Sequence, residues 1–409
     1  MAQIKPFKAI RPKPELAEKV AELPYDVVSS QEAAEIAKGN TYSFFHISKP
    51  EIDMGNVDVY SQQVYDAGRK ALESFVSEET FIKEENPCYY LYTQTMGERS
   101  QTGIVACVSI DDYIESRVKK HELTREDKEL DRTNHLDIVN ANTGPVFLFF
   151  KDNDKRKPLF EKALSIQPIY DFVAADSIRH TVRIIKDEVL IQELTQLIAP
   201  ETLYIADGHH RAASAVKVGI NRRKEFPNYT GQEEFNSFLS VIFPHSELKI
   251  LAYNRAVKDL NGLSAESFIE ELKSKNFTIE KTGKKVPDTS KEFSMYLEKN
   301  WYTVKPNFEI TKDPVAGLDV RILQDNVFAP ILGINDPRKD KRIDFIGGIR
   351  GTDELEKITD AGEYKIAFSM YPTTLEQLIE VSDVDKIMPP KSTWFEPKLR
   401  SGLLLHSLD

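Results

Sequence analysis

The sequence predicts a mixed α/β (α+β) protein. Residues 89–95 and 102–110 are rich in β-branched and aromatic side chains, which favour strands. Apolar residues recur at three- and four-residue spacing over 57–75 and form one face of a helix. Segments of both kinds alternate along the chain, without an internal repeat or a low-complexity tract. The pattern does not determine the order of the strands.

The N-terminal elements have local boundary signals. Residues 3–10 alternate loosely as a short strand, which Pro12 ends. Ser29 and Glu32 form a capping box at the start of a short helix, which Gly39 ends.

The middle of the chain continues the alternation. The two strand-rich segments form a predicted hairpin around a turn at 96–101. The elements expected after it are a charged loop and helix over 117–137, strands near 146–150, 169–174 and 181–185, a helix near 188–198, a strand over 202–206, and a helix over 209–218 that Gly219 ends.

Length and pattern indicate two domains, over residues 1–250 and 251–409. A chain of 409 residues exceeds one ordinary domain. The second domain is predicted to contain a helix capped by Ser264 with Phe268, Ile269 and Leu272 on its apolar face, a helix over 319–328, a strand over 365–371, a capping box at Thr373 and Glu376, and an irregular stretch at 388–395 because of its prolines.

Composition excludes several classes of protein. The net charge of −11 argues against sequence-independent binding to nucleic acid. The two cysteines, Cys88 and Cys107, have no zinc-site spacing and fit a reducing compartment. We find no signal peptide and no apolar run of membrane-spanning length. A cytoplasmic enzyme is therefore expected, and the oligomeric state cannot be read from these features.

One motif carries recognisable chemistry. A predicted buried strand runs into Asp207-Gly208-His209-His210-Arg211, where a helix begins at once. The first N–H groups of a helix lack intrahelical partners and attract anions such as phosphate. Gly208 permits a sharp turn, Arg211 can grip phosphate oxygens, and Asp207 could hold Mg²⁺. The plainer interpretation makes Asp207 a helix cap and leaves the basic side chains solvated. We favour the anion site because His and Arg at a helix N-terminus oppose its dipole.

Three other segments are weaker signals. A Lys120-His121-Glu122 segment lies in a charged stretch, as does Arg132 nearby. Lys391, Ser392 and Thr393 follow two prolines and could bind phosphate or a carboxylate, although each segment alone is more typical of a surface. Residues 346–351 lack the lysine and hydroxyl of a phosphate loop, so we expect a turn there.

The order of these motifs resembles that of the free serine kinases of the ParB/sulfiredoxin-like superfamily. In that family a Lys-Pro-His-Glu segment precedes a strand–Asp-Gly-His-His-Arg–helix segment, and a Pro-Lys-Thr-Thr segment lies near the end. This chain has Lys120 where the family has proline, and a longer gap between Glu122 and Asp207. Its N-terminal segments at 6–12 and 24–29 resemble a long bacterial branch that is catalogued without a function.

The resemblance implies a ParB/sulfiredoxin-like nucleotide-binding core, a second α/β domain that closes the site, and a kinase reaction. ATP or ADP would donate a phosphoryl group to free L-serine with Mg²⁺. Glu122 would be the catalytic base beside His121. The nucleotide would lie at the turn 207–211, and serine would contact Arg132 and the segment 391–393. A ParB-like nucleotide-dependent switch and a kinase for another small alcohol stay open. A sulfiredoxin-type reductase would need a cysteine where His209 stands.

Overall fold

A computed structural model describes residues 2–409, and the chain divides into two compact units. Unit 1 runs to Leu248 and also contains the terminal segment Pro397–Asp409, whereas unit 2 is Lys249–Glu396. The chain leaves unit 1 close to the expected boundary at 250. The sequence pattern does not predict that the last segment returns to unit 1.

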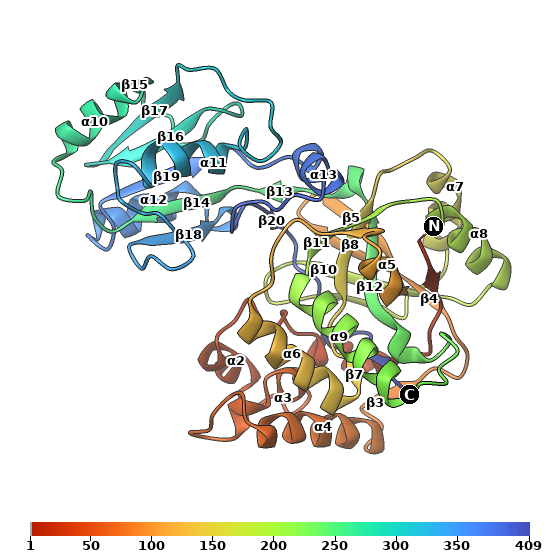
Figure 1. The fold of residues 1–409 in the computed structure, drawn as a ribbon. Helices are drawn as coiled ribbons and strands as arrows, with labels where there is room; N and C mark the ends of the chain where they lie inside the picture. The colour runs from red at the N-terminus through yellow and green to blue at the C-terminus, as the bar shows by residue number, and fades with distance from the viewer. Residues whose placement is uncertain (1) are drawn as a thin grey trace. The chain divides into compact units, whose positions relative to one another are not determined.

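Unit 1 is built on a nine-stranded mixed sheet (Figure 1). Its strands are β1 (Ile4–Lys5), β4 (Tyr89–Met96), β5 (Arg99–Ser109), β6 (Val118–Lys119), β8 (Val146–Phe150), β9 (Tyr170–Val173), β10 (Arg179–Ile185), β11 (Leu203–Asp207) and β12 (Ser237–Pro244). Their order is β6-β11-β8-β12-β5-β4-β10-β9, with β1 paired to β5. The predicted hairpin is β4 and β5, which are joined at the paired residues Met96 and Arg99. The mixed α/β class is confirmed.

The helices of unit 1 pack around this sheet and beside it. They are α1 (Ala17–Val20), α2 (Ser30–Ala37), α3 (Phe45–Ser48), α4 (Gln62–Ser77), α5 (Ile110–Ile114), α6 (Glu126–Val139), α7 (Arg156–Leu164), α8 (Glu188–Ile198) and α9 (His209–Glu225), with short 3₁₀ turns η1 (Pro14–Leu16), η2 (Pro50–Asp53), η3 (Glu234–Asn236) and η4 (His245–Glu247). Two small ladders pair β2 (Ile10–Pro12) with β3 (Phe81–Lys83), and β7 (Ala141–Asn142) with β21 (His406–Ser407).

The main core lies between the sheet and its covering helices. All residues of β8 and β12 are buried, which explains why β8 is continuously apolar instead of alternating. Leu194 of α8 and Val216 of α9 belong to the same core cluster. A second cluster gathers the N-terminal helices and includes Phe75 of α4 and Leu405 of the terminal segment.

Two helix boundaries differ from those expected. Helix α9 continues past Gly219 to Glu225. A Cβ at Gly219 would lie 2.5 Å from the Phe235 carbonyl oxygen and 2.6 Å from Ile110, so this glycine allows close packing and does not end the helix. Helix α4 begins only at Gln62, after the first part of the periodic stretch.

Unit 2 contains a six-stranded sheet. Its strands are β14 (Tyr253–Val257), β15 (Phe277–Lys281), β16 (Phe293–Leu297), β17 (Asn300–Pro306), β18 (Ile343–Gly347) and β19 (Ile366–Met370), and β13 (Ile250–Leu251) pairs separately with β20 (Trp394–Phe395). The order in the sheet is β15-β17-β16-β19-β14-β18. The helices are α10 (Ala265–Ser274), α11 (Asp319–Leu323), the π-helix η5 (Gln324–Phe328), the 3₁₀ turn η6 (Gly348–Arg350), α12 (Gly351–Asp360) and α13 (Leu375–Asp383).

The cap of α13 lies one residue later than predicted. Thr374 and Gln377 form the capping box. Thr373 instead donates its hydroxyl to the Ser392 carbonyl oxygen at 2.8 Å, because its side chain is directed toward the loop before β20. That loop was expected to be irregular throughout, but β20 adds a two-residue strand at its end.

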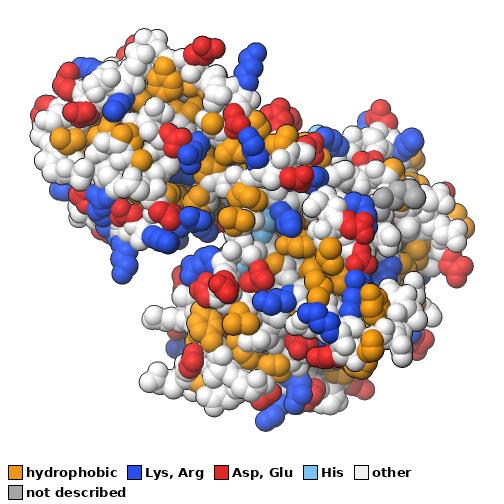
Figure 2. Space-filling model, viewed as in Figure 1, with side chains coloured by type: hydrophobic (Ala, Val, Ile, Leu, Met, Phe, Trp, Pro, Cys, Tyr) orange, Lys and Arg blue, Asp and Glu red, His pale blue; other side chains and the backbone are white. Residues whose placement is uncertain are grey.

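The surface mixes charges of both signs. On the face in Figure 2, acidic and basic side chains are interspersed over each unit. No helix within residues 2–409 has the length and apolarity needed to cross a bilayer.

Candidate functional site

The strand–glycine–helix motif folds as a tight turn. Residues 203–206 of β11 are buried, and Gly208 is the N-cap of α9 with a left-handed φ of 91°. Gly208 has no side chain with which to cap the helix, and Asp207, one residue earlier, is not the cap. Within residues 2–409, the first N–H groups of α9 thus receive no acceptor from a capping side chain, as an anion site requires.

Gly208 is needed for two reasons. Its positive φ disfavours other residues. A Cβ would also lie 3.0 Å from Nε and 3.1 Å from Cζ of Arg211, so the guanidinium folds back over the glycine. Arg211 donates to the Pro145 carbonyl and is thereby fixed against the turn.

Parallel pairing brings the second motif to the first. Strand β6 pairs with β11 in the register Val118–Leu203 and Lys119–Tyr204. Since the carboxyl ends of neighbouring parallel strands lie at one edge of a sheet, the residues after β6 meet those after β11. His121 and Glu122 thus lie beside the turn that begins at Asp207.

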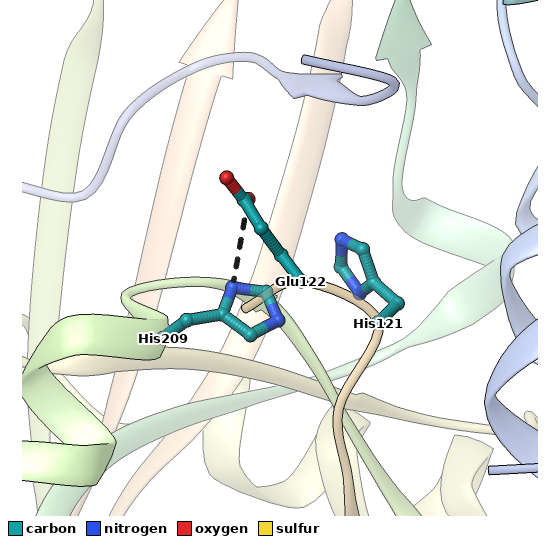
Figure 3. Close-up of side chains that lie close together, drawn as sticks. All are labelled: His121, Glu122 and His209. Carbon is teal, nitrogen blue, oxygen red and sulfur yellow. Dashed lines mark ion pairs between the residues drawn. The ribbon is translucent and has the colours of Figure 1, made fainter. Parts of the chain in front are cut away.

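The three side chains at this junction face one another (Figure 3). The rings of His121 and His209 meet edge to face with centroids 4.5 Å apart. His209 Nδ1 lies 4.0 Å from a carboxylate oxygen of Glu122. The Glu122 side chain is 42% exposed, against 6% for His209, so its carboxylate can be reached from solvent.

Burial keeps both imidazoles neutral. It lowers the pKa of His121 to about 4, although Asp207 acts in the opposite direction. Burial and the neighbouring His121 also lower the pKa of His209 well below its usual value. At neutral pH, these rings can serve as hydrogen-bonding groups or metal ligands.

Two cations surround the Asp207 carboxylate. Its Oδ2 atom lies 3.4 Å from Lys398 Nζ and 3.5 Å from Arg211 Nη2. Burial opposes ionisation of Asp207, but Lys398 and Arg211 outweigh it and lower the pKa of the carboxyl group. Asp207 is therefore an anion at every physiological pH.

Lys398 is a candidate site residue that the sequence patterns did not predict. It belongs to the terminal segment, whose backbone is fixed where Gln94 donates to the Lys398 carbonyl at 2.8 Å. Arg400 anchors the same segment through His180, at 3.3 Å, and Asp176. The signal in the sequence is a Pro-Lys pair, Pro397-Lys398, that closely follows the one at 390–391.

The two histidines of the motif have different surroundings. His210 Nε2 accepts the Arg125 backbone N–H at 2.9 Å, so this ring holds the loop before α6. His209 instead faces Glu122, as described above.

Arg132 lies in a neighbouring network. It pairs with Asp131 at 2.9 Å, and its Cζ atom lies 4.2 Å from the centroid of the Tyr25 ring. Burial raises the pKa of Tyr25, while the charges of Arg132 and Arg211 oppose that rise. Tyr25 therefore lies within the electrostatic influence of both Arg132 and Arg211 of the motif.

The remaining predicted residues belong to unit 2. Lys391 has a positive φ of 56°, and its carbonyl accepts from Arg255 at 3.0 Å. Ser392 donates its hydroxyl to the Pro389 carbonyl at 2.6 Å and is buried. Thr393 follows directly, before β20. The structure thus brings together residues of the first two motifs, in unit 1, whereas the third motif is part of the other unit.

The junction also offers metal ligands. One ligand atom each from His121, Glu122 and His209 lie within 4.8 Å of one another. Two imidazoles and a carboxylate suit a borderline divalent ion such as Zn²⁺ better than Mg²⁺, which prefers oxygen. Mg²⁺ would instead need oxygen ligands, and the carboxylate of Asp207 is the group at the turn that could supply one.

Together, the turn, the neutral imidazoles and the accessible carboxylate form a candidate anion-binding site with a carboxylate beside it, at the edge of an α/β sheet. The chain belongs to the family described as Protein of unknown function (DUF1015), whose model matches residues 4–321. A comparison with curated proteins gave no match.

Several solved structures share a weak likeness. A glutamine variant of a free serine kinase in complex with AMP has a TM-score of 0.39 and 14% identity, over 73% of this chain and 92% of that one. A conserved hypothetical protein from Pyrococcus furiosus has a TM-score of 0.37 and 15% sequence identity, over 74% of this chain and 95% of that one. SbnI with a C-terminal truncation, from Staphylococcus aureus, has a TM-score of 0.38 and 11% sequence identity, over 74% of this chain and 87% of that one. Similarities at this level do not establish a shared function.

Proposed function

We propose that this protein is a Mg²⁺-dependent kinase that transfers a phosphoryl group from ATP or ADP to the hydroxyl of free L-serine. The observation that carries the proposal is the position of the exposed Glu122 carboxylate, 4.0 Å from His209 at the uncapped N-terminus of α9. A general base thus lies beside a turn suited to phosphate. The motif order, which resembles that of the free serine kinases, supports serine as the acceptor.

These positions support the following reaction. The phosphate oxygens of the nucleotide would accept hydrogen bonds from the first backbone N–H groups of α9. Arg211 and Lys398 would supply positive charge. The serine oxygen would attack phosphorus while Glu122 takes the hydroxyl proton. The bond from phosphorus to the leaving ADP, or AMP if ADP is the donor, would break. The product is O-phosphoserine.

Mg²⁺ would neutralise the charge of the transferring phosphates. Asp207 fits it, because Lys398 and Arg211 both lie against Oδ2 and Oδ1 has no hydrogen-bond partner within residues 2–409. One carboxylate plus substrate phosphates is the usual Mg²⁺ environment in kinases. The proposal also assigns serine binding to Arg132 and to Lys391, Ser392 and Thr393.

Phosphorus NMR tests the reaction. The protein is incubated with Mg²⁺, L-serine and either ATP or ADP, and a serine-dependent phosphomonoester signal of O-phosphoserine is expected. Glu122→Gln should lower the rate by about 10²- to 10⁴-fold, the range for loss of a general base. Glu126→Gln, an exposed residue of α6, is the matched control and should keep the rate.

The outcomes separate the parts of the proposal. No phosphoserine with either nucleotide would remove the serine kinase activity, and other small alcohols would be screened next. Full activity in Glu122→Gln would remove Glu122 as the base while leaving the reaction in place.

A further inference from the structure

A second site is suggested by a buried arginine in unit 2. Arg255 on β14 is only 3% exposed. It forms no ion pair with any carboxylate of residues 2–409, and its two hydrogen bonds go to the carbonyls of Tyr253 and Lys391. A guanidinium has five N–H donors, so most of its capacity is left. A buried charge without an opposite charge is costly unless a ligand supplies one.

Arg255 lines a cavity of about 270 Å³. The other charged residues of the lining already have partners nearby. Arg321 pairs with Asp325 at 2.8 Å, and Arg338 pairs with Asp336 at 3.0 Å. Only the positive charge of Arg255 is uncompensated, so the cavity favours an anion with a single charge.

The walls of the cavity indicate the rest of the ligand. Val320, Phe328 and Phe345 give it an apolar side. Gln324 and Phe328 belong to the π-helix η5, a rare form that is frequently found at functional sites. A small volume, apolar walls and one convergent charged group are typical of a pocket for a small molecule.

The side chain of Arg255 is also held in place. It lies over the Phe345 ring at 5.3 Å, and burial lowers the pKa of its guanidinium to about 10, which still leaves it charged at neutral pH. A fixed, planar guanidinium suits a carboxylate, which it can bind through two parallel hydrogen bonds.

We propose that this cavity binds a small organic monocarboxylate through Arg255. The proposal does not depend on phosphoryl transfer, because both the site and its test concern binding alone. It makes Arg255 a ligand-binding residue in addition to a support for the Lys391 loop.

Arginine side-chain ¹H–¹⁵N NMR of the full chain tests the site. Propionate and L-serine are titrated, with 1-propanol as the uncharged control and inorganic phosphate as the competing anion. The expected result is a saturable shift of one Nε resonance with the carboxylates, and none with 1-propanol. Arg255→Lys, which keeps the charge and loses the planar fork, should lack that resonance and bind at least tenfold more weakly.

Two further variants keep the test decisive. Arg350→Gln removes an exposed arginine of the same unit and should bind as the wild type does. Asn335→Trp fills the cavity from an exposed lining position without altering Arg255, so it should abolish the shift even if Arg255 variants unfold. No shift with either carboxylate, or tighter binding of phosphate than of propionate, would overturn the proposal and leave Arg255 as a clamp for the loop.

Discussion

At the scale of single residues, the site depends on the missing side chain of Gly208. A Cβ there would be strained by the φ of 91° and would lie 3.0 Å from Arg211 Nε, so the guanidinium would have to move. Gly231 offers a matched comparison, because its φ is 87° but nothing would lie within 4 Å of an added Cβ. The two positions therefore separate backbone strain from displacement of Arg211.

We expect Gly208→Ala and Gly231→Ala each to lower the free energy of unfolding by about 1–2 kcal/mol, the cost of a left-handed L-residue. Only Gly208→Ala should also weaken nucleotide binding, by about tenfold or more, because it displaces the guanidinium. Urea unfolding and nucleotide titration measure the two effects. Equal nucleotide affinity in both variants would show that Arg211 does not contribute to the site.

At the scale of elements, the sequence predicted what local chemistry determines. The hairpin of β4 and β5, helix α8 at Glu188–Ile198 and the cap at Ser29 are as expected, since each follows from neighbouring residues. The pairing of β6 with β11 could not be predicted, because two-residue strands carry no pattern. That pairing is what brings Glu122 to His209.

The terminal segment shows the same limit. Its residues 399–408 give no periodic signal, yet Leu405 exchanges two backbone hydrogen bonds with Ile10, and Ser401 does so with Glu22. These pairings join parts of the chain that are far apart in sequence, and they also determine the position of Lys398. Residue patterns do not encode such distant partners.

Ending the chain at Glu396 should therefore unfold unit 1. Five leucines of the segment are buried: Leu399, Leu403, Leu404, Leu405 and Leu408. At roughly 1.5–3 kcal/mol each, their loss approaches the whole stability of a typical domain. Near-UV circular dichroism and calorimetry would show the loss, with removal of Asp409 alone as the control. Cooperative melting of the truncated chain at the wild-type temperature would contradict this.

At the scale of the whole molecule, stability is tied to pH through buried histidines. Burial lowers the pKa of His121 to about 4, and of His135 and His180 to about 3, from 6.5. As the pH falls, these histidines therefore become protonated in the unfolded chain before they do so in the folded chain. The stabilisation is fully present above pH 6.5 and is lost as the pH falls toward the folded values.

We expect the free energy of unfolding to fall between about pH 6 and pH 4 by about 1.4 kcal/mol per pH unit for each of these histidines. Urea unfolding across this range measures the slope. His135→Gln is the informative variant, because an amide can still donate to the Ile47 carbonyl that His135 Nε2 contacts at 2.9 Å. The slope of its unfolding free energy against pH should be smaller by about 1.4 kcal/mol per pH unit, the contribution of one histidine. An unchanged slope would mean that His135 titrates alike in both states and that other groups produce the acid sensitivity.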